Sequence, residues 1–466
     1  MKRCSKLRHR KAGRMARLSA VVGLALCAAP AMAQPGEPSL SLEDALAQAQ
    51  QASESVTVAR SDVERARAGV TAARSGYLPT VNGTASYQRT LRSEFEDISF
   101  APPGMEQEGG ETDLPFGQRN NWRLGLVLSQ PLFDGFRTPA AIAQAKAGVR
   151  VAELGVKATR AQVALAVAQA YYDAALAQRQ VEIAEVTLQQ AEQTLADTKL
   201  NFQQGAAPEF DLVRAEVARD NQSTTLVQFR AQRDVSFVQL RRLVGVPVDR
   251  PLTLSTKLEA EDVDQVIASV LRAAGLSQDT QRFVVAQAKE SVAAREAGVR
   301  VAKADRLPTI SASSDFGIVS YERSPFHDDW RTNWTIGVSL SLPIFDGFRR
   351  RAQIATSSAE LAAARAQLAS AQEVSHVEAA QATANVTARL TTLETTKRTV
   401  GQAKRAYQIA ELRFQQGGST HLELVDARVQ LEQALLNLAR SARDVRVARV
   451  RQALLPGLPL GAAGGF

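Results

Sequence analysis

The chain of 466 residues contains one structural unit written twice, and this internal repeat constrains the fold more than any other feature. The segment Pro131–Arg137 (PLFDGFR) recurs 212 residues later as Pro343–Arg349 (PIFDGFR). The segment Phe202–Gly205 (FQQG) recurs at the same offset as Phe414–Gly417. Solenoid repeats are only about 20–50 residues long. The repeat therefore predicts two similar halves rather than a solenoid.

A third pair of matching segments marks the start of the first strand in each half. Leu78–Thr80 matches Leu307–Thr309 at an offset of 229, so the first half carries a longer insert between its strands. Each half reads as helix, strand, strand, long helix, turn and helix. The predicted divisions are a signal peptide at 1–33, a first repeat at 34–246, a linker at 247–260, a second repeat at 261–455 and a flexible tail at 456–466.

Alternation of apolar and polar residues predicts two strands in each half, because successive side chains of a strand point to opposite faces. The strands are expected at about 77–88, 122–131, 306–318 and 334–343. A soluble sandwich would also use such strands. Two features favour a lipid-facing barrel instead: each strand has the nine to eleven residues needed to cross a bilayer, and aromatic residues lie near the strand ends. These aromatic residues are Tyr77, Tyr87, Trp122, Tyr321 and Trp334.

The segment Arg137–Gln203 predicts an unusually long helix, since no proline occurs between Ala140 and Ala207. A continuous helix of this length would extend ~100 Å at 1.5 Å per residue. Spacings of three and four indicate a coiled-coil seam, although an ordinary core stripe would show them too. The seam residues are Val181, Ala184, Leu188, Ala191, Leu195, Thr198 and Phe202, and then Leu393, Thr396, Val400, Ala403, Tyr407, Ala410 and Phe414.

Four strands cannot close a barrel, and open sheet edges are not tolerated in lipid. Two or more copies must therefore share one barrel, with eight strands for a dimer or twelve for a trimer. Eight strands enclose an interior filled by side chains. A duct therefore favours the trimer.

The first 33 residues read as an export signal. Residues 2–17 hold eight Lys and Arg and no acid, an apolar stretch follows, and Ala31–Ala33 offers a cleavage site. A buried N-terminal helix is the alternative for this segment. Cleavage before Cys27, with lipid attached to that cysteine, is a second alternative, but Leu26 fits poorly just before the cut.

The excess charge of +8 lies entirely in this signal, so 48 basic residues face 48 acidic ones afterwards. The pI near 9.6 therefore gives no indication of nucleic-acid binding. Both cysteines also lie in the signal, and the histidines are scattered. No metal-ligand spacing, nucleophile motif or phosphate loop occurs. The sequence predicts neither an enzyme nor a cofactor or metal site.

The repeated strand exits have physical roles. Pro131 and Pro343 lack a ladder donor and suit a strand's end. Asp134 and Asp346 are expected to cap the following helix. The remaining pair, Gly135 and Gly347, permits the sharp change of direction.

The repeated motifs resemble the TolC-like outer membrane efflux protein family. The resemblance rests on the duplicated Leu-Pro strand entry, the duplicated Pro-[Leu/Ile]-Phe-Asp-Gly strand exit and the duplicated Phe-Gln-Gln-Gly turn. It implies a homotrimer in the outer membrane, with a twelve-stranded β-barrel continuous with a long periplasmic α-helical barrel. It also implies a passive exit channel for efflux or type I secretion, with a periplasmic adaptor and an inner-membrane exporter as partners.

In this family the turns between the long helices form the closed periplasmic end and the adaptor contact. The corresponding residues here are Gly205, Ala206, Ala207, Pro208, Gly417, Gly418, Ser419 and Thr420. Family acids that form a constricting ring match Glu423 and Asp426, and their first-repeat equivalents are Asp211 and Arg214. Ser419 replaces the arginine of the family's usual closing salt link.

Two interpretations of the tip acids stay open. We expect Glu423 and Asp426, three apart on one helix face, to form an acidic ring that narrows the exit, with Asp211 as a further candidate. The acids would alternatively stabilise a helix N-terminus through its macrodipole.

An exported periplasmic coiled-coil adaptor or structural protein is the alternative functional class. It explains the helices and the export signal but not four strands of membrane length. The cargo is not indicated by the sequence.

Overall fold

A computed structural model describes residues 39–92, 119–255, 258, 263–276, 281–321, 330–416 and 418–461. The predicted signal peptide at 1–33, with its Cys27, and the turn residue Gly417 lie outside the described residues. The elements are β1 (Ser39–Leu40), α1 (Leu42–Ala52), α2 (Glu54–Arg74), β2 (Thr80–Arg89), β3 (Asn120–Phe133), α3 (Arg137–Gln203), α4 (Glu209–Val244), β4 (Thr253–Leu254), α5 (Val263–Ala274), α6 (Phe283–Ala304), β5 (Thr309–Ser320), β6 (Arg331–Ser341), α7 (Arg349–Gln415) and α8 (His421–Leu454). Short 3₁₀ turns occupy Ser75–Tyr77 and Leu455–Gly457.

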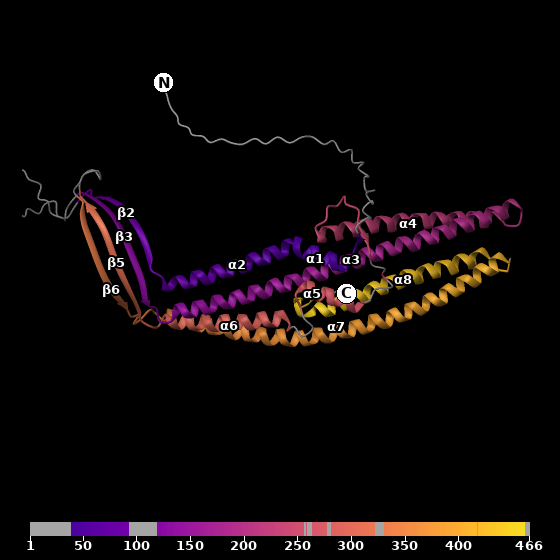
Figure 1. The fold of residues 1–466 in the computed structure, drawn as a ribbon. Coiled ribbons are helices and arrows are strands. Elements are labelled where there is room, and N and C mark those ends of the chain that lie inside the picture. The colour runs from indigo at the N-terminus through magenta and orange to yellow at the C-terminus, as the bar shows by residue number, and fades with distance from the viewer. Residues whose placement is uncertain are drawn as a thin grey trace, which may run out of the picture. The chain divides into compact units, whose positions relative to one another are not determined.

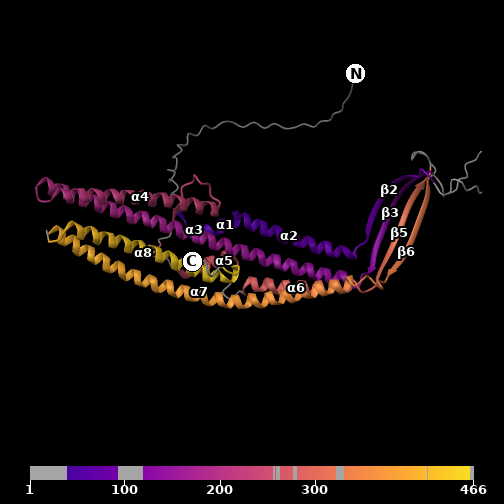
Figure 2. The same ribbon diagram turned by 180° about the vertical axis from the view of Figure 1, so that it is seen from behind.

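The two longest helices, α3 and α7, each contain 67 residues. The predicted continuous helix over Arg137–Gln203 is therefore confirmed with both of its ends. Each long helix turns back into a shorter partner, so that α4 lies beside α3 and α8 beside α7 (Figures 1 and 2). The duplicated sequence thus produces two helical hairpins.

The predicted heptad seam is visible in the side-chain exposure of α7. The seam residues from Leu393 to Phe414 are half-buried or buried, whereas every residue between them from 394 to 410 is exposed. On α3 the seam residues Val181, Ala184 and Ala191 are buried, with 4%, 0% and 2% of their surface exposed. Small seam residues such as these alanines let neighbouring helices approach closely.

The four long strands form one antiparallel sheet in the order β2-β3-β5-β6 (Figure 1). The central pair, β3 and β5, joins the two repeats, with Trp122 opposite Ser320 and Ser129 opposite Ser313. Tyr87 and Trp122 face each other across β2 and β3, and their rings stack with centroids 4.1 Å apart. The sheet is therefore a joint product of both repeats.

The strand ends differ from the expected positions by a few residues. The strand β2 begins at Thr80 because residues 75–77 form the 3₁₀ turn. Pro343 lies beyond the end of β6 at Ser341, where a residue without an N–H donor fits. The other proline, Pro131, lies inside β3, where the register with β5 shifts between Pro131 and Phe133. Pro131 therefore lies two residues before the end of β3, at the irregularity in the ladder, and not beyond the strand as Pro343 does.

The main hydrophobic core gathers side chains from α1, α3, α4, α5, α6 and α8. Tyr171 and Tyr172 on α3 are fully buried there, and the hydroxyl of Tyr171 donates a hydrogen bond of 3.0 Å to the carbonyl of Leu40. The segment between the repeats returns to this core, because β4 pairs in parallel with β1. The core thus ties the start of the described chain to the middle of the sequence.

The tail predicted to be flexible from residue 456 is packed in its described part. Leu458 is only 1% exposed and belongs to the main core. The backbone N–H of Gly461 donates to the carboxylate of Glu378 on α7, and the same carboxylate forms a buried ion pair with Arg282. Residues 456–461 are therefore held against the helices, and the rest of the predicted tail lies outside the described residues.

Candidate functional site

The turns of the two helical hairpins lie at the same end of the helices (Figures 1 and 2). The first turn follows α3, where Gly205 has a φ of +72°, a conformation that glycine adopts without steric cost. The N–H of Ala206 closes this turn on the carbonyl of Asn201 at 2.8 Å. In the second turn the N–H of Gly418 donates to the carbonyl of Arg413, also at 2.8 Å.

The helices after both turns begin in equivalent ways. Asp211 is the third residue of α4, and Glu423 is the third residue of α8. The hydroxyl oxygen of Thr420 accepts a hydrogen bond of 3.4 Å from the N–H of Glu423, which caps α8. Pro208 precedes α4 and supplies no side-chain cap. Acids in the first turn stabilise a helix end through its dipole, and Glu423 occupies such a position in α8.

Glu423 also has a cationic neighbour from the other side of the turn. A guanidinium nitrogen of Arg413 lies 4.0 Å from its carboxylate, and the same side chain donates to the carbonyl of Gly418 at 3.2 Å. Arg413 therefore places a positive charge beside this turn although Ser419 replaces the expected arginine. Both Glu423 and Asp426 are exposed on α8.

A cavity of about 960 Å³ lies between the two hairpins just behind the turns. Asp211 and Arg214 line it from α4, and His421 lines it from α8. The sequence-predicted acids are thus separated, because Asp211 is half-buried at the cavity while Glu423 and Asp426 do not line it.

His421 is 4% exposed, and neither ring nitrogen has a hydrogen-bond partner within the described residues. Its ring packs near that of Phe414, with centroids 5.9 Å apart. Burial lowers the pKa of His421, and Arg214 and Arg428 lower it further, while the carboxylate of Asp211 opposes them. The imidazole is therefore held in its neutral form.

A second set of buried polar groups lies close to this histidine. The hydroxyl of Tyr407 donates to Glu411 at 3.1 Å, and burial, reinforced by Glu411, raises the pKa of Tyr407 to about 12. On α8, Arg428 and Glu432 are 4% and 9% exposed. The amide of Gln222 on α4 donates to Glu432 at 2.9 Å, so a polar contact joins the two hairpins.

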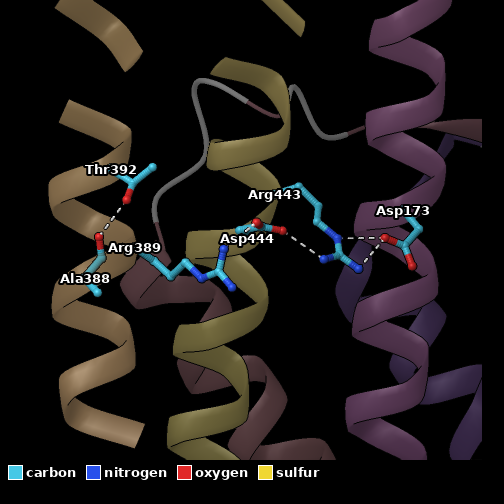
Figure 3. A network of polar contacts seen from close by, with 6 residues as sticks. All are labelled: Asp173, Ala388, Arg389, Thr392, Arg443 and Asp444. Atoms are coloured by element: carbon cyan, nitrogen blue, oxygen red, sulfur yellow. Dashed lines mark hydrogen bonds and ion pairs between the residues drawn. The ribbon is translucent and has the colours of Figure 1, made fainter. Parts of the chain in front are cut away.

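A further polar network joins three helices closer to the core (Figure 3). Arg443 on α8 contacts Asp173 on α3 at 2.6 Å and its neighbour Asp444 at 2.9 Å. The other oxygen of Asp444 accepts from Arg389 on α7 at 2.9 Å. Burial by itself would lower the pKa of Arg443, but the two carboxylates outweigh it and the pKa is raised. This chain of alternating charges links α3, α8 and α7.

The strand-to-helix switches lie at the opposite ends of α3 and α7. Asp134 accepts a hydrogen bond of 2.6 Å from the N–H of Thr138, and Asp346 accepts one of 2.9 Å from the N–H of Arg350. Gly135 and Gly347 both have a φ of +65°. The two switches therefore share one backbone geometry.

The sequence profile of the family "Outer membrane efflux protein" matches residues 45–246 and 279–457, well over half of the chain. The chain belongs to the outer membrane efflux protein family. The family resemblance carried by the repeated motifs is thereby confirmed.

Two individual proteins are similar to part of this chain. Nodulation protein T of Rhizobium leguminosarum bv. viciae is 26% identical over 276 residues, which cover 59% of this chain and 55% of that protein. Outer membrane protein TolC of Escherichia coli (strain K12) is 23% identical over 257 residues, 53% of this chain and 51% of that protein. The chain thus spans about half the length of these relatives.

The fold is similar to that of the CmeC outer membrane channel of Campylobacter jejuni, with a TM-score of 0.73. The two are 17% identical, and the match covers 90% of this chain and 86% of that one. This likeness establishes the mostly helical fold with its strand hairpins.

The sequence did not identify the buried polar residues of the cavity. Tyr407 was recognised only as a seam residue, and His421 only as one of several scattered histidines. The i, i+4 spacing of Arg428 and Glu432 beside Leu424 was the available signal, since it places both charges on a helix face that α8 buries.

Within the part of the chain that the structure describes, no group of three or more His, Cys, Asp and Glu side chains is arranged to hold a metal ion. Among the described helices, none combines the length and apolarity required to cross a membrane.

Proposed function

We propose that the chain is one protomer of a passive outer-membrane exit channel, serving a tripartite efflux pump or a type I secretion system. The exposed apolar face of the sheet carries this proposal. On β6, Trp334, Ile336, Val338 and Leu340 are between 67% and 75% exposed in the protomer. They alternate with small polar residues and glycine, which is the pattern of a strand with lipid on one side and a polar interior on the other.

The proposed assembly is a homotrimer with a twelve-stranded barrel. Strands β2 and β6 form the two edges of the sheet, and such edges require a partner within lipid. Three sheets of four strands close a barrel wide enough for a lumen, whereas two would give an interior filled by side chains. The hairpins would extend into the periplasm, toward an adaptor and an inner-membrane exporter.

Localisation and assembly are tested together by fractionation and electrophoresis. We expect the chain in the outer-membrane fraction, released only by detergent, and as a trimer whose gel migration changes on heating. An adaptor or structural protein would be released without extraction of the outer membrane. That result would overturn the proposal.

The proposed constriction lies at the turns, where Glu423 and Asp426 are exposed and repeat three times in a trimer. A ring of carboxylates favours cations over anions. We expect Glu423→Ala/Asp426→Ala to raise single-channel conductance in planar bilayers and to lower cation selectivity. The matched control is Glu182→Ala/Glu185→Ala, which removes two acids of the same spacing from the middle of α3. Unchanged conductance and selectivity in Glu423→Ala/Asp426→Ala would contradict the proposed constriction.

A further inference from the structure

A second cavity, which we name the junction pocket, lies where the sheet meets the helices. Its volume is about 640 Å³. One wall comes from Phe136, which precedes α3, and from Pro139 in the first turn of α3. The other wall comes from the end of α6 and the turn before β5. The pocket adjoins the sheet but contains none of the residues of the hairpin turns.

The first wall is apolar and held in place by the backbone. Phe136 has a φ of 66°, a conformation that bulky residues rarely adopt. Its ring packs edge-on against Phe133 at 5.3 Å between centroids, yet the side chain remains 66% exposed. Together with Pro139 and Leu307, it provides an apolar surface that the described chain does not cover.

The other wall is cationic. Arg300, Lys303 and Arg306 line the pocket at a spacing of three residues, and all three are exposed. None of them has an ion pair within the described residues. Asp305, which lies between Lys303 and Arg306 in the sequence, is already engaged by Arg137 at 3.1 Å. Three positive charges therefore surround an apolar pocket without a counter-ion.

The repeat provides an internal comparison for these cations. At the offset of 229 residues, the positions equivalent to Arg300, Lys303 and Arg306 hold Thr71, Arg74 and Tyr77. The first repeat builds the same helix and the same strand entry with a single cation. The duplicated fold therefore does not require the three charges.

We propose that the junction pocket binds an anionic phospholipid of the periplasmic leaflet, with an acyl chain against Phe136 and Leu307 and the phosphate held by Arg300, Lys303 and Arg306. The inference rests on the proposed function, because a sheet embedded in the outer membrane places this junction at headgroup level. Guanidinium and ammonium groups are the side chains that recognise phosphate oxygens.

The test uses the full-length purified trimer and native mass spectrometry with three probes: phosphatidylglycerol, zwitterionic phosphatidylethanolamine and inorganic phosphate. We expect retention of phosphatidylglycerol in preference to phosphatidylethanolamine, and no competition from millimolar phosphate. In Arg300→Gln/Lys303→Gln/Arg306→Gln, affinity for phosphatidylglycerol should fall on the order of a hundredfold, since each basic residue near an anionic surface contributes about fivefold. The matched control, Lys404→Gln/Arg405→Gln/Arg440→Gln, removes equal charge from α7 and α8 and should bind like the original protein.

The variant Phe136→Ser tests the contact with the acyl chain separately from the contact with the phosphate. It should weaken phosphatidylglycerol binding while leaving the three cations intact. Equal binding by the triple Gln variant, or full displacement by inorganic phosphate, would overturn the lipid site while a heat-modifiable trimer in the outer membrane still upheld the channel. A chain that forms no membrane-embedded trimer would overturn both proposals.

Discussion

The side-chain amide of Gln222 on α4 donates a hydrogen bond of 2.9 Å to the carboxylate of Glu432 on α8, across 210 residues of sequence. This contact joins the hairpin of the first repeat to that of the second, behind the turns where the constriction is proposed. Burial raises the pKa of Glu432, while Gln222 and Arg428 act in the opposite direction. The amide is therefore one of two groups that stabilise a buried carboxylate.

Replacing Gln222 should loosen this contact. In Gln222→Met the carboxylate of Glu432 loses its donor, and leaving a buried polar group unsatisfied costs about 1–3 kcal/mol. We expect faster amide hydrogen exchange in residues 424–436 of α8. Gln433→Met is the control, because the Gln433 amide bonds to Asn437 on the exposed surface of the same helix. Equal exchange in both variants would show that the inter-hairpin bond contributes nothing.

His421 should make the tip sensitive to acid. Its pKa is lowered in the folded chain, chiefly by burial, so its stabilising contribution is full above its usual pKa of about 6.5 and is lost as the pH falls through the lower folded value. Hydrogen exchange in residues 418–428, corrected for intrinsic rates, should therefore increase between pH 7.5 and pH 5. His421→Leu should remove most of this increase, whereas His376→Leu, at an exposed position of α7, should retain it. An unchanged pH response in His421→Leu would contradict the assignment.

The buried ion pair between Arg282 and Glu378 should be costly to break from one side. Their side chains are 7% and 6% exposed, and removing one partner of such a pair costs about 3–5 kcal/mol. Glu378→Leu should lower the urea midpoint strongly, and Arg282→Met/Glu378→Leu should recover most of the loss. The control Glu296→Leu disrupts an exposed pair with Arg365 and should cost under about 1 kcal/mol. If the double variant is as unstable as Glu378→Leu, the unpaired charge of Arg282 is not the cause of the lost stability.

The two strand-to-helix glycines should tolerate alanine unequally. Both have a φ of +65°, which costs an alanine about 1–2 kcal/mol. A Cβ on Gly135 would also lie 2.7 Å from the carbonyl oxygen of Ala304, whereas nothing lies within 4 Å at Gly347. Gly135→Ala should therefore lower the unfolding temperature of the trimer more than Gly347→Ala. Equal shifts would mean that the junction relaxes and only the backbone conformation matters.

Local patterns in the sequence predict the parts of the fold that depend on neighbouring residues. The absence of proline and the heptad spacing identify α3 with both ends, and the alternation from Trp334 to Leu340 identifies β6. The repeated aspartates, Asp134 and Asp346, accept backbone hydrogen bonds as their position before a helix suggests.

Contacts between distant segments leave no such pattern. Arg282 and Glu378 lie 96 residues apart, and their pairing depends on how α6 packs on α7. The packing of Leu458 depends on a core to which six helices contribute. His421 follows a turn in sequence, yet it is buried because the two hairpins close over it.

The pairing of β3 with β5 also has a consequence for biosynthesis. Arg123 and Val319 lie opposite each other in the sheet although about 200 residues separate them. The hairpin of β2 and β3 consequently emerges with its inner edge unmatched until the second repeat has been made, and such edges are prone to pair with other chains. Because long-range pairing is slow, productive folding requires the nascent first hairpin to be shielded from aggregation during that interval.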